Sequence, residues 1–239
     1  MPFSALLLIA ACATPDADTD PTPSEGPNLL ANPAFEEGFG DAWLVYPLTR
    51  TNFAVLPETP DDPEGPEGPN DPEGPDDTVD TDNASTDTSA TEPTPDAGIP
   101  YEGARFLRLW GVHNGAPGGA ANETPIYQEL PVTPGVALIL RGYALHPSAA
   151  PIGAADTWAN LVLKFFDDDF TYLGGAKSET IGFQQGTDVW VKLEATGRPP
   201  WGTTLVQAGA EFHQCVGSAG GCDTAGSVSF DALTLAELR

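Results

Sequence analysis

Apolar and polar residues alternate over many short stretches of the chain. In residues 160–166, Leu161, Leu163 and Phe165 share one side, whereas Lys164 lies between them on the other. The same alternation recurs over residues 189–195 and 205–212. A period of two is typical of strands with one buried face. No apolar helical periodicity of useful length is present, so we expect an all-β chain.

Turn-forming Gly, Pro, Asn and Asp separate the strand candidates from one another. The candidates are residues 42–46, 52–56, 104–110, 126–130, 136–145, 160–166, 170–175, 189–195, 204–212 and 227–235. Several short strands at regular spacing predict an all-β sandwich.

Residues 57–100 interrupt this pattern. They contain fourteen acidic side chains and no Lys or Arg, together with three PEG units. Like-charge repulsion and Pro prevent regular pairing. We therefore predict a disordered, acidic Pro/Gly-rich loop inserted between two strands, which loop-closure entropy tolerates.

The acidic segments explain most of the formal net charge of −26, which comes from 35 acidic and nine basic residues. Residues 13–27 and 57–100 together hold 18 of the acids and none of the bases, which leaves −8 for the remainder. A chain with so few cations is not expected to bind nucleic acid.

The N-terminus contains a short apolar run, residues 5–11, which is too short to span a bilayer as a helix. The run ends in Ile9-Ala10-Ala11-Cys12, which resembles the lipobox of bacterial lipoprotein signal peptides. We therefore expect a signal peptide over 1–12, a lipidated Cys12, a disordered tether over 13–27, and an exported protein anchored at the bacterial outer membrane or cell surface rather than the inner membrane. No Lys or Arg precedes the run, and a chance apolar N-terminus is the alternative.

Two further cysteines, Cys215 and Cys222, flank the short Gly-rich stretch CVGSAGGC. An oxidising compartment would permit a disulfide between them. A pair of free thiols is the alternative.

Five motifs occur in a fixed order: NLLANPAFEEGFGDAW, YEGARFLRL, IYQELPVTPGVALILRGYA, WVKLEATGRPPWGTTLVQAGAEF and VSFDALTL. Together they resemble the CenC-type carbohydrate-binding modules (families 4 and 9), which are galactose-binding-like β-jelly rolls. The resemblance covers 28–239 apart from the acidic insertion and implies a jelly-roll domain. We expect a single domain and a monomer. Two positions depart from it: Ala232 replaces a second Asp, and Trp201 replaces a small residue.

Such modules commonly hold a structural calcium ion, and the resemblance implies its ligands here. The matching groups are the carbonyls of Ala34 and Gly103 and the carboxylate of Asp231, with Glu36 nearby. Loop carbonyls and carboxylates are suitable oxygen ligands for Ca²⁺. The alternative is that Asp231 caps a strand end.

The resemblance also places a sugar site on the concave sheet. The matching residues are Tyr46, Gln128, Lys164, Tyr172 and Gln207, and Trp158 and Trp201, in loop contexts, are further stacking candidates. Strand alternation allows Gln128, Lys164 and Gln207 to point away from the core. Aromatic rings stack on sugar faces and amides orient hydroxyls, although each aromatic could instead pack in the core or at an edge.

No catalytic constellation is recognised in the sequence. Asp167, Asp168 and Asp169 are adjacent on a predicted turn, which differs from the opposed carboxylate pair of glycoside hydrolysis. We therefore expect a non-enzymatic protein that binds a polysaccharide or glycan. The alternative is a surface adhesion or structural module that binds a protein partner.

Overall fold

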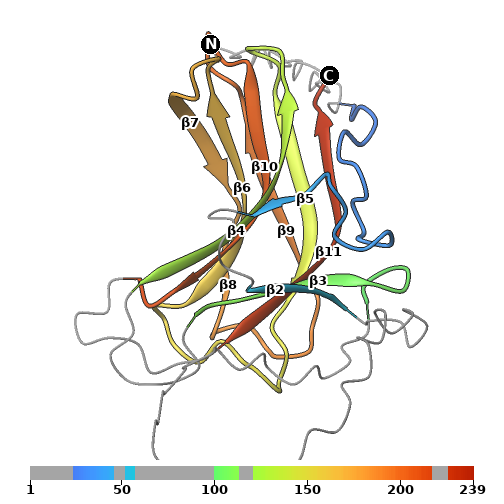
Figure 1. Cartoon of the computed structure of the whole chain (residues 1–239), viewed down its shortest axis with the longest axis vertical. Helices are drawn as coiled ribbons and strands as arrows, with labels where there is room; N and C mark the ends of the chain where they lie inside the picture. Colours follow the sequence, from blue (N-terminus) through green and yellow to red (C-terminus); the bar gives the residue numbers. More distant parts are fainter. Residues whose placement is uncertain (1–23, 46–51, 57–99, 113–120, 217–225) are drawn as a thin grey trace, which may run out of the picture.

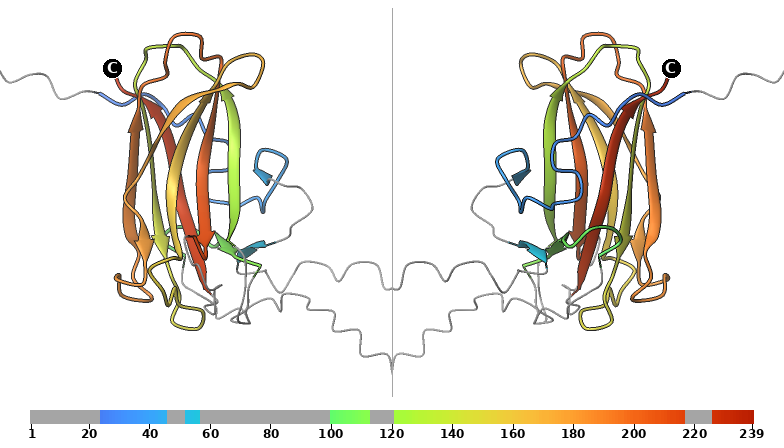
Figure 2. Two further views of the ribbon diagram at one scale, coloured as in Figure 1. Left: turned by 90° about the vertical axis from the view of Figure 1, so that its left-hand side faces the viewer. Right: turned by 90° about the vertical axis from the view of Figure 1, so that its right-hand side faces the viewer.

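The computed structural model describes residues 24–45, 52–56, 100–112, 121–216 and 226–239. These residues form two antiparallel sheets packed as a sandwich, and the long strands of both sheets are aligned with a common axis (Figures 1 and 2). The all-β jelly-roll fold predicted from the sequence is confirmed. Within the described ranges, no helix has the length and apolar character needed to cross a membrane.

The first sheet has the order β1–β4–β10–β6–β7, and the short β8 pairs with β6. Its strands are β1 (Leu44–Val45), β4 (Asn122–Pro131), β6 (Trp158–Phe166), β7 (Tyr172–Lys177), β8 (Ile181–Gly182) and β10 (Leu205–Gln214). The sequence pattern predicted all of them except β8, whose two residues are too few to show a period.

The second sheet has the order β2–β3–β11–β5–β9. Its strands are β2 (Phe53–Leu56), β3 (Phe106–Trp110), β5 (Leu138–Leu145), β9 (Val191–Gly197) and β11 (Ser227–Glu237). A bulge interrupts the pairing of β11 with β5 between Asp231 and Thr234. There Ala232 has a positive φ of 51°, a conformation in which Cβ crowds the backbone.

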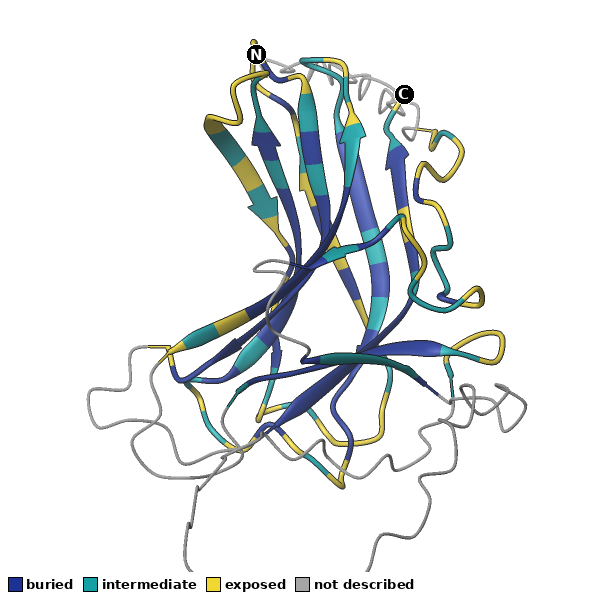
Figure 3. Cartoon of the chain, viewed as in Figure 1, coloured by how far each residue is buried: buried dark blue, intermediate teal, exposed yellow. Residues whose placement is uncertain are grey.

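The core lies between the sheets, where the inward-facing apolar side chains of the long strands are buried (Figure 3). In β10 these are Val206, Ala208, Ala210 and Phe212, each fully buried. On the neighbouring strand β6, Leu161, Leu163 and Phe165 are the register partners of Ala210, Ala208 and Val206, and they point into the same core. Alternation therefore predicted the core faces of both central strands correctly.

Strands β2 and β3 flank the acidic segment, and they are adjacent antiparallel partners. Leu56 pairs with Phe106, near the two ends of residues 57–99, which lie outside the described residues. The chain therefore leaves and rejoins the sandwich at one place. An insertion between paired neighbours leaves the register of the sheet unchanged, which is why the fold accommodates it.

The ordered domain begins earlier than the expected boundary at residue 28. The backbones of Ser24 and Arg239 exchange two hydrogen bonds of 2.9 Å, and Gly26 N–H donates to the Glu237 carbonyl. These bonds satisfy backbone groups beyond the end of β11 that would otherwise be unpaired. The last residues of the expected tether are therefore part of the sandwich.

Candidate functional site

The first sheet presents one polar face to solvent, which we call the outer face. The strands of this sheet bend at mid-length, so that the outer face curves inward (Figure 1). The register places on it alternate residues of four strands. The polar and aromatic ones are Glu123, Tyr127, Glu129, Trp158, Asn160, Lys164, Phe166, Tyr172, Lys177, Gln207, Glu211 and His213.

A buried carboxylate lies at the centre of this face. Glu211 is 1% exposed, and each of its two carboxylate oxygens contacts two donors. The Tyr127 hydroxyl donates to Oε1 at 2.6 Å, and Lys164 Nζ pairs with the same oxygen. Lys177 Nζ lies 3.3 Å from Oε2, and His213 Nε2 donates to Oε2 at 3.1 Å.

These contacts fix the charge states of the network. Burial alone would raise the pKa of Glu211, but hydrogen bonds from His213, Lys164 and Tyr127 outweigh it and hold the pKa well below its usual range. Burial and the neighbouring Glu211 raise the pKa of the Tyr127 hydroxyl. Glu211 is therefore an anion and Tyr127 a neutral donor at neutral pH. Neither is poised for proton transfer near pH 7.

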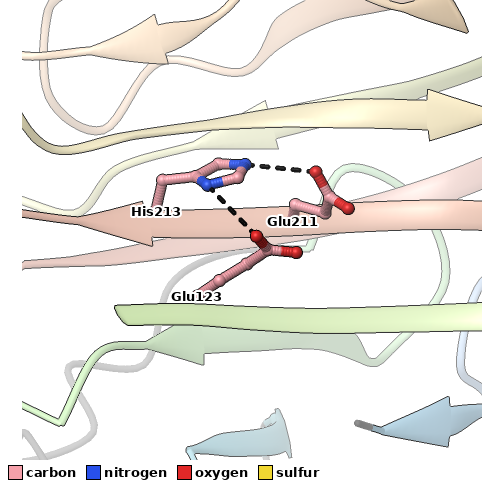
Figure 4. A group of neighbouring side chains, drawn as sticks. All are labelled: Glu123, Glu211 and His213. Atoms are coloured by element: carbon pink, nitrogen blue, oxygen red, sulfur yellow. Dashed lines mark hydrogen bonds and ion pairs between the residues drawn. The ribbon is translucent and has the colours of Figure 1, made fainter. Parts of the chain in front are cut away.

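Glu123, Glu211 and His213 place ligand atoms within 4.8 Å of one another (Figure 4). His213 Nδ1 lies 3.7 Å from Glu123 Oε2. A divalent cation is not needed there, because Lys164 Nζ contacts Glu211 and lies 3.7 Å from Glu123 Oε1. The ammonium groups supply the positive charge, and the cluster is an ion-pair network.

Trp158 begins β6 and lies on the outer face, rather than in the loop context expected from the sequence. Its ring stacks on His213. It also lines a pocket of about 210 Å³ beside β8, together with Ala155, Thr157, Thr180, Gly182, Phe183, Gln184 and Gln185. Aromatic walls with a few hydroxyls and amides are typical of small-molecule sites.

A polar atom without a partner lies two residues along the same strand. Asn160 is 2% exposed, and its Oδ1 has no hydrogen-bond donor among the described residues. The register pairs Asn160 with Glu211, which places it on the outer face. A buried acceptor of this kind calls for a water or a ligand hydroxyl.

Tyr172 lies at the opposite end of the face and is 59% exposed. Its side chain extends along β7 over Gly175, which has no Cβ. A Cβ added at Gly175 would lie 3.1 Å from the Tyr172 hydroxyl. Phe166 contacts its ring edge-on, with 5.7 Å between centroids. These neighbours hold the ring in place and leave much of it accessible.

Gln128 is not on the outer face, so its predicted placement was wrong. It pairs with Ala208 on the core side of the sheet and is 3% exposed. Its amide donates to the Ala31 carbonyl and accepts from the Ala31 N–H, at 2.5 and 3.0 Å. The Gln128 side chain thereby satisfies both backbone groups of Ala31, as a neighbouring strand otherwise would.

The other predicted sugar-binding residues divide into three groups. Lys164 and Gln207 pair with each other on the outer face, where Gln207 Nε2 donates to Glu129 Oε1 at 2.8 Å. Trp201 lies in the turn before β10 and is 88% exposed. Tyr46 lies outside the described residues.

Sequence reasoning did not single out Tyr127, Asn160, Glu211 or His213. The outward direction of Glu211 could have been predicted, because Glu211 is four residues from Gln207 on β10 and so lies on the same face of the strand. The convergence of donors from β4, β6, β7 and β10 on one carboxylate could not be predicted, since it depends on the register between distant segments.

The two carboxylates expected as calcium ligands both contact the turn at residues 101–105. Glu36 Oε1 accepts from the N–H groups of Ala104 and Arg105, at 2.8 and 3.0 Å. Asp231 accepts from Glu102 and Ala232, at 3.0 and 2.7 Å. Leu233 N–H donates to the Pro33 carbonyl, next to Ala34.

The charge on Asp231 is incompletely balanced. This residue is fully buried, and the described residues contain no cationic side chain paired with it. Burial raises its pKa to about 6, although backbone hydrogen bonds from Glu102, Ala232 and Tyr101 act in the opposite direction. An anionic oxygen in this situation fits the chemistry of a hard cation.

The remaining predicted modifications fall largely on residues that are not described. Cys12 and Cys222 lie outside the described residues, and Cys215 is buried at 2% exposure. The lipid anchor and the Cys215–Cys222 disulfide therefore stay predictions.

No protein-family model and no curated protein sequence matches this chain. Its structural neighbours include "TmCBM61 in complex with beta-1,4-galactotriose", with 13% identity, a TM-score of 0.45, and coverage of 88% of this chain and 98% of that one. The CBM22-1 xylan-binding domain from Paenibacillus barcinonensis Xyn10C has 14% identity and a TM-score of 0.44, over 90% and 98% of the two chains.

The enzymatically active domain of bacteriophage CBA120 tailspike protein 4 has 12% identity and a TM-score of 0.45, and the match covers 88% of this chain and 21% of that one. The chain thus spans about a fifth of the tailspike domain. The sandwich itself is established by the strand order and register of this chain.

Proposed function

We propose that the outer face of the first sheet binds a carbohydrate chain without cleaving it. The observation that carries this proposal is the placement of two aromatic side chains at opposite ends of one polar, concave face: Trp158 is half-buried and lines the pocket, and Tyr172 is exposed. Trp158 begins β6, and Tyr172 pairs with Phe166 at the end of β6. At the usual rise per strand residue, the path along β6 from Trp158 to Phe166 is about 26 Å.

The groups between these aromatics suit sugar hydroxyls. Gln207, Lys164 and Asn160 provide amide, ammonium and carbonyl groups along the face, all on rigid strands. Stacking on the rings supplies contact area, and fixed polar groups supply orientation. A face of this length fits an oligosaccharide segment better than a single sugar.

The same geometry argues against hydrolysis. Both oxygens of Glu211 are held by donors, and its pKa lies below its usual range, so it is not a general acid. Asp167 accepts from the N–H groups of Asp169 and Thr171, which makes it a turn-stabilising residue.

A screen of the full chain against a glycan array and insoluble polysaccharides tests the proposal. Binding that is lost in Tyr172→Ala and in Gln207→Ala supports it. The absence of any bound glycan, or equal binding by both variants, sinks it. Capture of a protein partner that sugars do not compete away would favour the adhesion alternative.

A calcium ion at the turn is part of the proposal. The carboxylates of Asp231 and Glu36 and the carbonyls of Ala34 and Gly103 would hold it, and the ion would neutralise the buried Asp231. Its role would be structural, because the turn fastens the opening segment to β11.

Export and membrane anchoring through Cys12 complete the proposal. Residue 24 joins the sandwich beside Arg239, so a lipid at Cys12 would hold the domain on a linker of about eleven residues. Metabolic labelling with a fatty acid, with Cys12→Ser as control, tests the anchor.

A further inference from the structure

The positive charges of the outer face are neutralised from within the protein. Lys164 of β6 and Lys177 of β7 both contact Glu211 of β10. Among the described residues of this face these are the two lysines, and they stand beside three carboxylates, since Glu123 and Glu129 also lie there. The face therefore carries no surplus of positive charge.

The surroundings of Glu211 have the composition of an anion-binding site. A phenol, two ammonium groups and an imidazole, from Tyr127, Lys164, Lys177 and His213, all point at one carboxylate. Charge-assisted hydrogen bonds of this kind are the strong ones in carboxylate recognition. Because Glu211 is almost fully buried, it fills this site permanently.

The pocket beside Trp158 provides an independent observation. Its lining consists of aromatic, hydroxyl, amide and small residues, and it includes no charged side chain. It holds no ammonium, guanidinium or imidazole to neutralise a carboxylate or sulfate of a ligand, while Thr157, Thr180 and Gln184 suit neutral hydroxyls.

We infer that Glu211 is a specificity-determining residue: it occupies the anion site of the outer face and so makes the face accept uncharged glycans and reject acidic ones. The inference rests on the proposed function. A ligand carboxylate would meet Glu123, which is 42% exposed, and two lysines that already have a counter-ion. Unpaired like charges across an interface suppress the wrong partner.

The first test compares the neutral polysaccharide that the wild-type chain retains best with the same polymer after carboxymethylation. We expect the wild type to bind the acidic form roughly ten-fold more weakly at low salt. Glu211→Gln should gain roughly ten-fold on the acidic form, because it releases two lysines for the ligand, and the gain should shrink as salt is added. Glu129→Gln is the matched control, because it removes one charge from the same face without contacting either lysine.

The second test does not require a glycan. In Glu211→Ala the anion site is vacated, and sodium acetate should raise the melting temperature of this variant more than sodium chloride at equal ionic strength. The wild type should not distinguish the two salts. Because each protein is compared with itself in the two salts, a lower melting temperature of Glu211→Ala than of the wild type does not affect the result.

The outcomes separate the two claims. If no glycan is retained by any variant, the proposed function fails, and the acetate measurement still reports on the anion site. If the wild type binds both polymers equally, if Glu129→Gln gains as much as Glu211→Gln, or if acetate acts no better than chloride on Glu211→Ala, the role of Glu211 is overturned.

Discussion

The indole ring of Trp158 stacks on the imidazole of His213, with 5.3 Å between their centroids and 24° between their planes. His213 in turn donates to Glu211. The pocket wall and the buried ion-pair network therefore belong to one connected surface. A change at Trp158 should alter ligand binding directly, and a change at Glu211 should alter it through His213 as well as through the lysines.

Replacing Trp158 with Ala should reduce retention on the best-bound glycan by roughly ten-fold or more, because stacking area at the pocket is lost. Trp158→Phe should retain most of the binding, since it keeps a ring over His213. Affinity electrophoresis in gels that contain the polysaccharide measures both. Unchanged mobility of Trp158→Ala in the presence of the polysaccharide would place the ligand elsewhere.

Replacing Gly175 with Ala should both destabilise the fold and weaken glycan binding. The new Cβ would meet the backbone of Leu163 and approach the Tyr172 hydroxyl, which forces a shift costing about 1–3 kcal/mol. Gly186→Ala is the matched control, because no heavy atom outside Gly186 and its two chain neighbours lies within 4 Å of its Cβ position. Urea unfolding and glycan retention should therefore change together in the first variant, and a Gly175→Ala protein as stable as wild type would contradict this account of the strand.

Asp231 should make the calcium-free protein less stable as the pH rises from about 4 to about 6. Its pKa is raised from an ordinary 3.8 to about 6, so the folded state favours the protonated acid. The stabilising contribution is complete below the unfolded pKa and is lost as pH passes through the folded one, a change of roughly 2–3 kcal/mol. The free energy of unfolding of wild type relative to Asp231→Asn, measured in EDTA, reports this contribution directly.

Calcium should reverse that loss at neutral pH. Bound to the ionised Asp231, it would raise the melting temperature of the wild type and leave that of Asp231→Asn nearly unchanged. A flat difference between the two proteins from pH 4 to 7 would contradict the burial argument. Equal calcium shifts in both would instead remove Asp231 from the metal site.

Ala232→Gly should stabilise the protein by about 0.5–1 kcal/mol, because Ala232 has a positive φ of 51° that glycine adopts freely. Ala236→Gly, at a buried regular position of the same strand, should have the opposite sign. Thermal unfolding of both variants and the wild type measures these two changes in stability. Loss of stability in both would show that the bulge is not strained.

Much of the fold could be predicted from the sequence because the long strands are half buried. The alternation in β6 and β10 identified their core faces, and it also placed Lys164 and Gln207 outward. The two-residue β8 could not be predicted, since it is defined by its pairing with Trp158 and Ala159 rather than by its own pattern.

The site was less accessible to such reasoning. Gln128 has a polar side chain on the core side, where it satisfies the backbone of Ala31, and no local pattern reveals a partner 97 residues away. The network around Glu211 likewise depends on the register of β4, β6 and β7 with β10. Polar residues within strands could be assigned to a face by parity, but their contacts could not be inferred.

Chemical-shift mapping of the ¹⁵N-labelled chain, titrated with a soluble oligosaccharide of the best-retained glycan, shows whether the outer face is the binding surface. We expect saturable shifts clustered on β4, β6, β7 and β10, including the indole N–H of Trp158 and the side-chain amide of Gln207. Shifts clustered on β3, β5, β9 and β11, or none at saturating oligosaccharide, would contradict it.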